Sequence, residues 1–281
     1  VSVISFFLCY NNAMKKHLLN IISRLENQPG GPAAFFLSFA AIILVRLGLE
    51  IFAYSKGIPI DLLGFFHLFF FYLSLIICLI IIIYLLSRQQ LAKVAKLVLF
   101  GTMLIWLGPT VDLIISKGAG LSLTYLFIPL NEIPGRFIGF FGGSPELGVT
   151  YGARTTAVAL CLLVLFYIYC KTKNLIKALG GMVLTYTTIF LFSVIPSLAI
   201  SLEKWNINLT EGDVISSLSS PRNVFSIKRY YLADFFDFEM TLIFFPLSIL
   251  LLAIIFFIYR QEQARALLGN IRPTRFILQI I

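Results

Sequence analysis

Long apolar runs follow one another along the chain, separated by polar segments. A helix needs about 20 predominantly apolar residues to cross the hydrocarbon core of a bilayer. The runs of sufficient length are Ala33–Tyr54, Leu62–Leu86, Val94–Ser116, Thr150–Cys170, Ala178–Leu202 and Met240–Tyr259. The pattern predicts an all-α fold, a polytopic transmembrane helix bundle of about six spans. Pro109 interrupts the third run, and we expect a kink there because proline cannot donate a backbone hydrogen bond.

A shorter segment before the first run has a different pattern. In "MKKHLLNIISRLENQ" the apolar residues Leu18, Leu19, Ile22 and Leu25 fall near one face of a helix, and Lys15, Lys16 and Arg24 fall elsewhere. This is typical of an amphipathic helix in the membrane interface. The chain therefore divides into an apolar stub with an interfacial helix (1–32), a six-span domain (33–259) and a basic segment leading into a possible further span (260–281).

Composition agrees with a membrane protein. The chain is 59% hydrophobic and 12% charged, whereas soluble domains are typically about 25% charged. The net charge of +9 would suit nucleic acid, but the basic residues lie beside apolar runs and form no single stripe, so we exclude that partner. The expected partners are membrane lipids, with a lipid head group or a membrane protein as a specific ligand. The cysteines lack metal-ligand spacing, and we expect no cofactor and no metal.

Basic residues are concentrated at alternate connections, which predicts the topology. The basic segments carry Lys15, Lys16, Arg24, Arg88, Lys93, Lys96, Lys171, Lys173, Lys177, Arg260, Arg265, Arg272 and Arg275. The positive-inside rule places these segments and both ends of the chain in the cytoplasm. The long connections Lys117–Val149 and Glu203–Glu239 would then lie outside. We expect an integral protein of a prokaryotic plasma (inner) membrane.

The first apolar run, "FFLSFAAIILVRLGLEIFAY", contains two ionisable residues. Arg46 and Glu50 are four residues apart, so their side chains share a helix face and can pair. An unpaired ion in the hydrocarbon core costs at least about 2.5 kcal/mol. We therefore expect this face to turn toward the bundle or toward water.

Other ionisable residues fall at the same predicted level of the membrane. These are His67, Asp112, Arg154, Asp234 and Asp237, with Glu239 close by. Because intramembrane ions are usually functional, the pattern predicts an outward-facing polar pocket. Its candidate ligand-binding residues are Arg46, Glu50, His67, Asp112 and Arg154. The alternative for each is structural: an intrahelical pair, a tie between helices, or an interfacial histidine.

The connection before the fourth run, Tyr125–Arg154, is too apolar for an ordinary solvated loop. Its alternating aromatic and aliphatic residues predict a re-entrant or interface-lying segment. Gly148 and Gly152 would allow close backbone approach. The helix start that follows could bind an anion such as phosphate near Arg154, and the alternative is an ordinary helix cap at Thr150.

Catalytic motifs are missing from the sequence. It contains no GxxxxGK[ST] phosphate loop, no HExxH and no paired-cysteine zinc site. Asp234 and Asp237, at i and i+3, could bind a divalent ion if helical. The aromatic residues beside them suit interfacial anchoring equally well. We therefore leave open whether the chain is an enzyme.

The last twelve residues, "NIRPTRFILQII" (Asn270–Ile281), resemble the segment before the first membrane helix of UbiA-type polyprenyl transferases. That family binds a prenyl diphosphate through magnesium at Asn-x-x-x-Asp and Asp-x-x-x-Asp motifs. Neither motif occurs here, so the resemblance transfers no catalytic residue. It implies that these residues are an accessory membrane module ahead of a catalytic domain, and that the chain is a fragment of a longer protein. A transporter is the third possibility.

Overall fold

The computed structural model describes residues 12–53, 62–116, 125–126, 128–139, 150–204 and 232–260. The helices are α2 (Asn12–Glu26), α3 (Pro32–Ala53), α4 (Leu62–Ser87), α5 (Leu91–Gly101), the 3-10 helices η1 (Thr102–Trp106) and η2 (Leu130–Glu132), α6 (Leu107–Ser116), α7 (Ile133–Gly139), α8 (Tyr151–Thr172), α9 (Leu175–Lys204) and α11 (Leu232–Tyr259). The described residues contain no β-strand. Within these residues, six helical segments are long and apolar enough to cross a membrane, which confirms the all-α multi-pass fold.

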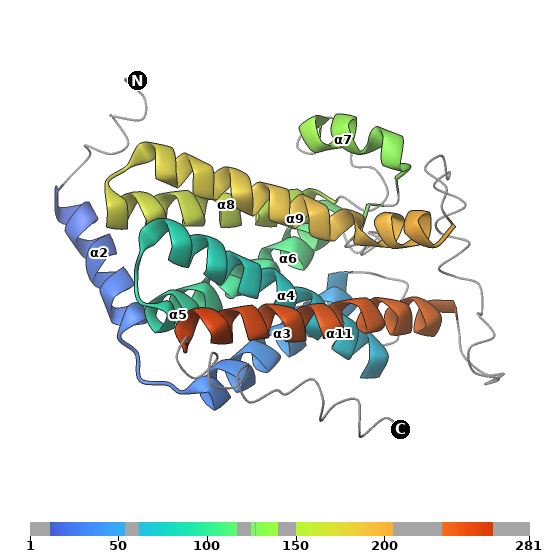
Figure 1. Ribbon diagram of the computed structural model, residues 1–281, viewed down its shortest axis with the longest axis horizontal. Helices are drawn as coiled ribbons and strands as arrows, with labels where there is room; N and C mark the ends of the chain where they lie inside the picture. The colour runs from blue at the N-terminus through green and yellow to red at the C-terminus, as the bar shows by residue number, and fades with distance from the viewer. Residues whose placement is uncertain are drawn as a thin grey trace, which may run out of the picture.

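The spans run side by side between two distinct ends of the bundle. Figure 1 shows α2 crossing one end, here called the α2 end, and the short α7 near the other, here called the α7 end. The basic helix termini at Arg88, Lys173 and Arg260 lie at the α2 end. The basic residues that follow α4, α8 and α11 therefore share one end of the bundle, as the sequence predicted for them. Which side of the membrane the α2 end faces stays a prediction.

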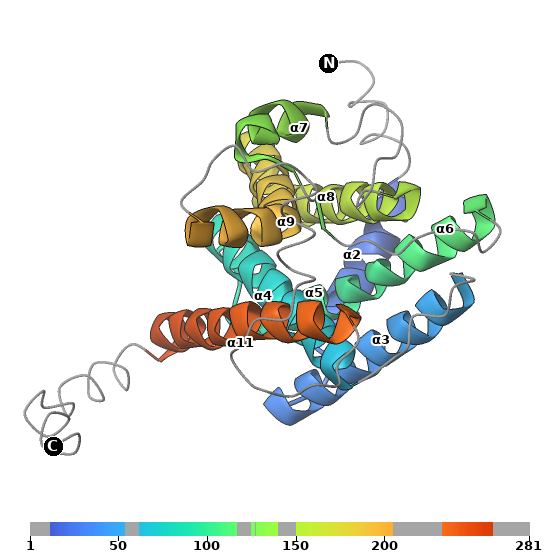
Figure 2. The same ribbon diagram turned by 90° about the vertical axis from the view of Figure 1, so that its right-hand side faces the viewer.

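Helix α4 is the centre of the bundle. It packs against α11, α9, α5, α8 and α3, and Figure 2 shows it between these elements. Over its membrane-crossing part 56% of α4 is buried inside the bundle, against 17% of α11. A helix that is apolar all round suits either environment. Leu250 and Phe257 of α11 remain exposed, as side chains that face lipid would be.

Several helices extend beyond the predicted spans. Helix α11 begins at Leu232 rather than Met240, so Asp237 and Glu239 lie inside the helix and not before it. Helix α9 covers Leu175–Lys204, and the third span begins at Leu91. Hydropathy marks only the part of a helix that crosses hydrocarbon, whereas the backbone continues its hydrogen bonds into the polar interface.

The predicted amphipathic helix is present as α2 and packs against α5. Ile22 is buried, and Leu25 packs on the main hydrophobic core. Within the connection Tyr125–Arg154, α7 lies beside α9 at the rim of the bundle. The Phe137 ring packs on Tyr186 and Phe190, while Ile138 is exposed. This arrangement favours the interface-lying alternative for the described part of that connection.

Some predictions fall outside the described residues. They concern the apolar stub (1–11), Gly148, the side chain of Asp234 and the basic segment 261–281. The segment that resembles the UbiA-type transferases, 270–281, is among them.

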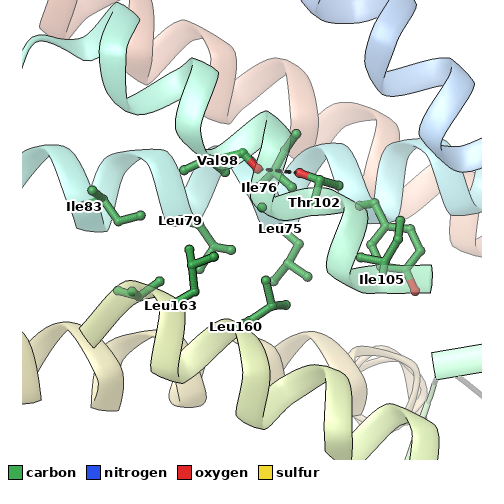
Figure 3. Close-up of a pocket in the computed structure, with 12 residues that line it drawn as sticks. Leu75, Ile76, Leu79, Ile83, Val98, Thr102, Ile105, Leu160 and Leu163 are labelled. Carbon is green, nitrogen blue, oxygen red and sulfur yellow. Dashed lines mark hydrogen bonds between the residues drawn. The ribbon is translucent and has the colours of Figure 1, made fainter. Parts of the chain in front are cut away.

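A small cavity lies between α4, α5, η1 and α8 (Figure 3). Its volume is about 20 Å³, which is room for roughly one water molecule. Its lining is almost wholly apolar, and the Thr102 hydroxyl donates to the Val98 carbonyl at 2.8 Å. The cavity is therefore a packing defect rather than a ligand site.

Gly101→Ala should stabilise the protein, because Gly101 lines this cavity at the end of α5. A Cβ there would meet its nearest neighbour, Leu163 Cδ2, at 3.5 Å, an ordinary contact. Removing the conformational freedom of glycine from a helix contributes about 0.5–1 kcal/mol. Unfolding in detergent should show this gain. A loss of stability would mean that α5 and α8 leave less room than the 3.5 Å to Leu163 Cδ2.

Candidate functional site

The third span contains a 3-10 segment, η1, which ends three residues before Pro109. Because Pro109 has no N–H, the carbonyl of Ile105 loses the donor that a regular helix would supply four residues later. Arg46 of α3 replaces it, with Nη1 donating to the Ile105 oxygen at 3.1 Å. The indole of Trp106 also donates to the Ile42 carbonyl of α3 at 3.0 Å. The predicted irregularity at Pro109 thus binds α3 to the third span.

Arg46 and Glu50 form the predicted ion pair. The distance from Arg46 Nη2 to Glu50 Oε1 is 2.6 Å, and the two residues are 8% and 7% exposed. The guanidinium also lies 4.8 Å from the ring centre of Tyr72 on α4, in cation–π geometry. This face of α3 therefore turns toward the bundle, and the prediction that the pair avoids lipid is confirmed.

Asp112 of α6 caps the start of α8. Its Oδ1 accepts from the Gly152 amide at 2.8 Å, and its Oδ2 accepts from the Thr150 hydroxyl at 2.5 Å. Thr150 in turn accepts from the Ala153 amide at 3.1 Å, as an N-cap residue does. The favourable anion position at this helix start is thus held by the carboxylate of Asp112. The structure favours the cap that the sequence left open as the alternative to a bound phosphate.

Two glycines let α6 and α8 approach closely at this point. A Cβ on Gly152 would lie 2.0 Å from the carbonyl oxygen of Gly108, a distance that no side chain can occupy. A Cβ on Gly108 would lie 3.7 Å from Arg46 Nη1. The predicted close approach at Gly152 is confirmed. It places the Arg46–Glu50 pair and the Asp112 cap beside one another, with Arg154 half-buried in the first turn of α8.

His67 joins three segments that are far apart in the sequence. Its Nδ1 lies 2.5 Å from Asp237 Oδ1 of α11, and its Nε2 lies 2.5 Å from the Tyr125 hydroxyl. Both His67 and Tyr125 are buried. The rings of Phe236 and Phe244 pack against the imidazole. Because a carboxylate can only accept, Nδ1 carries a proton toward Asp237.

Helix α9 holds the residues directly after Tyr125, through its backbone and the Ser197 hydroxyl. Close to the proline inside α9, Pro196, the Ser193 carbonyl accepts from the Leu126 amide at 2.8 Å. The Ser197 hydroxyl accepts from the Ile128 amide at 3.0 Å and donates to the Leu126 carbonyl at 3.1 Å. Burial raises the pKa of Tyr125 well above its usual range. The phenol therefore keeps its proton at neutral pH and can donate it to Nε2 of His67.

His67→Leu should lower the free energy of unfolding by about 2 kcal/mol, because it removes a hydrogen-bond partner from two buried or partly buried groups. Tyr125→Phe should lower the free energy of unfolding much less in the His67→Leu protein than in the unaltered protein, because the hydrogen bond between the two residues is already lost. Chemical unfolding of the four proteins in detergent measures this coupling. Additive losses would contradict the hydrogen bond between Tyr125 and His67.

Sequence reasoning missed a second buried ionic contact, at the α2 end. Glu26 is 5% exposed, accepts from the Tyr167 hydroxyl at 2.8 Å and pairs with Lys171 at 2.7 Å. The available signal was an acidic residue in the last turn of a helix, where the macrodipole disfavours it. Tyr125 was also missed, because nothing in its local sequence sets it apart.

Metal and divalent-ion sites find no support in the described part of the chain. No group of three or more His, Cys, Asp or Glu side chains there is placed to hold a metal ion. Asp237, one of the two residues predicted to bind a divalent ion, is instead hydrogen-bonded to His67.

Comparison of the chain with protein-family models, curated proteins and solved structures found no match in any of the three. The arrangement of residues is therefore the basis for proposing a function.

Proposed function

We propose that this multi-pass membrane protein binds the polar head group of a membrane lipid between α3, α6 and α8, in the half of the bundle nearer the α7 end. The cationic contacts would be Arg46 and Arg154, beside Glu50 and Asp112, and His67 would support the same half of the bundle. The observation that carries the proposal is the break before Pro109, which presents a backbone carbonyl to a buried arginine.

Packing alone gives no reason to bury an ion pair at this depth. Replacing a buried ion pair by apolar side chains of similar size is often neutral or stabilising. A regular helix with apolar partners would therefore hold α3 against the third span at least as well. A broken span and a buried ion at the same depth suit a polar ligand better, and intramembrane ions are usually functional.

The proposal requires α3 and α6 to separate locally. Arg46 would then exchange the Ile105 carbonyl for a phosphate oxygen, while Glu50 keeps the guanidinium oriented. A guanidinium suits this role because its planar set of donors matches a phosphate group. Asp112 would remain the cap of α8.

The test compares lipids retained by the purified protein in native mass spectrometry. Arg46→Met/Glu50→Leu removes the buried pair and keeps the side-chain volume, so we expect it to fold but to lose the retained phospholipid. Glu132→Leu/Arg136→Met is the matched control, because it removes an exposed i, i+4 pair between η2 and α7. If the folded double variant retains the same lipid as the unaltered protein, the proposal is wrong.

A transporter is the second candidate, and one observation favours it. Discontinuous helices that present backbone carbonyls near the middle of the membrane are typical of transporter binding sites, and the 3-10 break lies within the third span. Solute uptake into vesicles containing the purified protein would support this candidate. Equal uptake by vesicles with and without the protein would reject it for the solutes tested.

An accessory role beside a UbiA-type polyprenyl transferase remains a proposal based on the resemblance at 270–281. Reading the frame on either side of Val1 and Ile281 would test it first. Further spans with Asn-x-x-x-Asp and Asp-x-x-x-Asp motifs would support this role. A frame without them would reject it. A prokaryotic plasma membrane remains the predicted location.

A further inference from the structure

A groove opens at the α2 end, where α4 turns into α5 beside the end of α11. Its volume is about 560 Å³, within the range of ligand sites in proteins. It is lined by Tyr84, Leu85, Arg88, Gln89, Gln90, Leu91, Ile258 and Tyr259. This groove lies at the opposite end of the bundle from the head-group site proposed between α3, α6 and α8. It is therefore independent of that proposed function.

The lining of the groove combines apolar, aromatic and cationic groups. Leu85, Leu91 and Ile258 provide apolar surface, and Tyr84 and Tyr259 provide rings with polar tips. Tyrosines are enriched where a protein crosses the boundary between hydrocarbon and head groups. Among the described residues of the lining, none is acidic. The groove therefore suits a ligand with a negative group and an apolar part.

One arginine lines the groove, and a second follows a residue that lines it. Arg88 lines the groove and follows directly after α4. The guanidinium of Arg260 lies 5.3 Å from the ring centre of Tyr259, a residue that lines the groove. Arginine binds phosphate through two parallel N–H donors, which a point charge cannot do.

The backbone at Arg88 is in the left-handed region, with a φ of 54°. Glycine occupies this conformation at no steric cost, whereas other residues are disfavoured there. The turn is closed by the Arg88 amide, which donates to the Tyr84 carbonyl at 2.9 Å. Lys173, after α8, has a φ of 55° at the same end of the bundle but does not line the groove. The two residues form a matched pair for experiment.

We propose that this groove binds an anionic phospholipid, with its phosphate between Arg88 and Arg260 and its acyl chains along Leu85 and Ile258. The phosphate ester is recognised by charge and by paired N–H donors. The chains continue into the lipid that surrounds the bundle. A zwitterionic phospholipid presents the same phosphate beside a positive group and is expected to bind more weakly.

The experiment titrates the purified full chain with phosphatidylglycerol, phosphatidylcholine or glycerol phosphate and measures bound lipid by native mass spectrometry. Arg88→Gly is the informative variant, because it relaxes the left-handed backbone while it removes the charge. We expect it to unfold at the same temperature as the unaltered protein or higher, and to bind phosphatidylglycerol about fivefold more weakly. Adding Arg260→Gln should weaken binding by a similar further factor.

The matched control is Lys173→Gly, which makes the same backbone and charge change away from the groove. It should leave the affinity for phosphatidylglycerol unchanged. Equal losses in the Arg88→Gly and Lys173→Gly proteins would overturn the proposal, as would equal affinity for phosphatidylcholine. Glycerol phosphate binding as tightly as phosphatidylglycerol would overturn the lipid assignment, because the apolar wall would then contribute nothing.

Discussion

Arg46→Met should lower the free energy of unfolding by about 3–5 kcal/mol, and adding Glu50→Leu should restore most of that loss. The single change leaves Glu50 buried without the guanidinium that lies 2.6 Å away, and removing one member of a buried ion pair has a cost of this size. The double change replaces both ions by apolar groups, which a membrane bundle accommodates. Chemical unfolding in detergent measures both effects.

The Ile105 carbonyl should keep the double variant from full recovery of its stability. Both variants lose the Arg46 donor to that carbonyl, so the double variant should remain below the unaltered protein by about 1 kcal/mol. Matched against it, Glu132→Leu/Arg136→Met should change stability by less than about 1 kcal/mol, because that pair is exposed. A double variant as unstable as Arg46→Met alone would show that Glu50 is not the main source of the loss.

Gly152→Ala should destabilise the protein by about 3 kcal/mol or more. The added Cβ would lie 2.0 Å from the Gly108 carbonyl oxygen and 2.7 Å from Asp112 Oδ2. Both atoms belong to α6, and a backbone oxygen cannot move without its helix. The two helices must separate, which weakens the Asp112 cap and the packing around Arg46. Overpacking typically costs 1–3 kcal/mol, and a clash with backbone lies at the upper end.

Gly180→Ala provides the control for this change. Gly180 lies in α9, and nothing would approach its Cβ within 4 Å. We expect this substitution to be neutral or to stabilise the helix by up to about 1 kcal/mol. If Gly152→Ala and Gly180→Ala change the unfolding temperature equally, α6 and α8 are not in close contact at Gly152.

The apolar pattern by itself determined the fold class and the number of spans, because lipid allows only helices with satisfied backbones or closed barrels to cross it. The spacing of Arg46 and Glu50 determined their pairing, since helix geometry alone brings i and i+4 together. Pro109 likewise marked the irregular span, because its missing N–H is a property of the residue. Only the tertiary structure decided where the freed Ile105 carbonyl found its donor, since that donor lies on another helix.

The remaining site depended on contacts between distant segments. Asp112 caps a helix that begins at Tyr151, and His67 contacts residues 125 and 237. No local pattern encodes such pairs, because the side chains meet only after α6 packs on α8 and α11 packs on α4. The sequence therefore identified the ionisable residues, and it predicts their level in the membrane. The packing of α6 on α8 decided what lies at the start of α8. Because Gly108 and Gly152 let these helices touch, the carboxylate of Asp112 occupies the position where the sequence allowed a ligand anion.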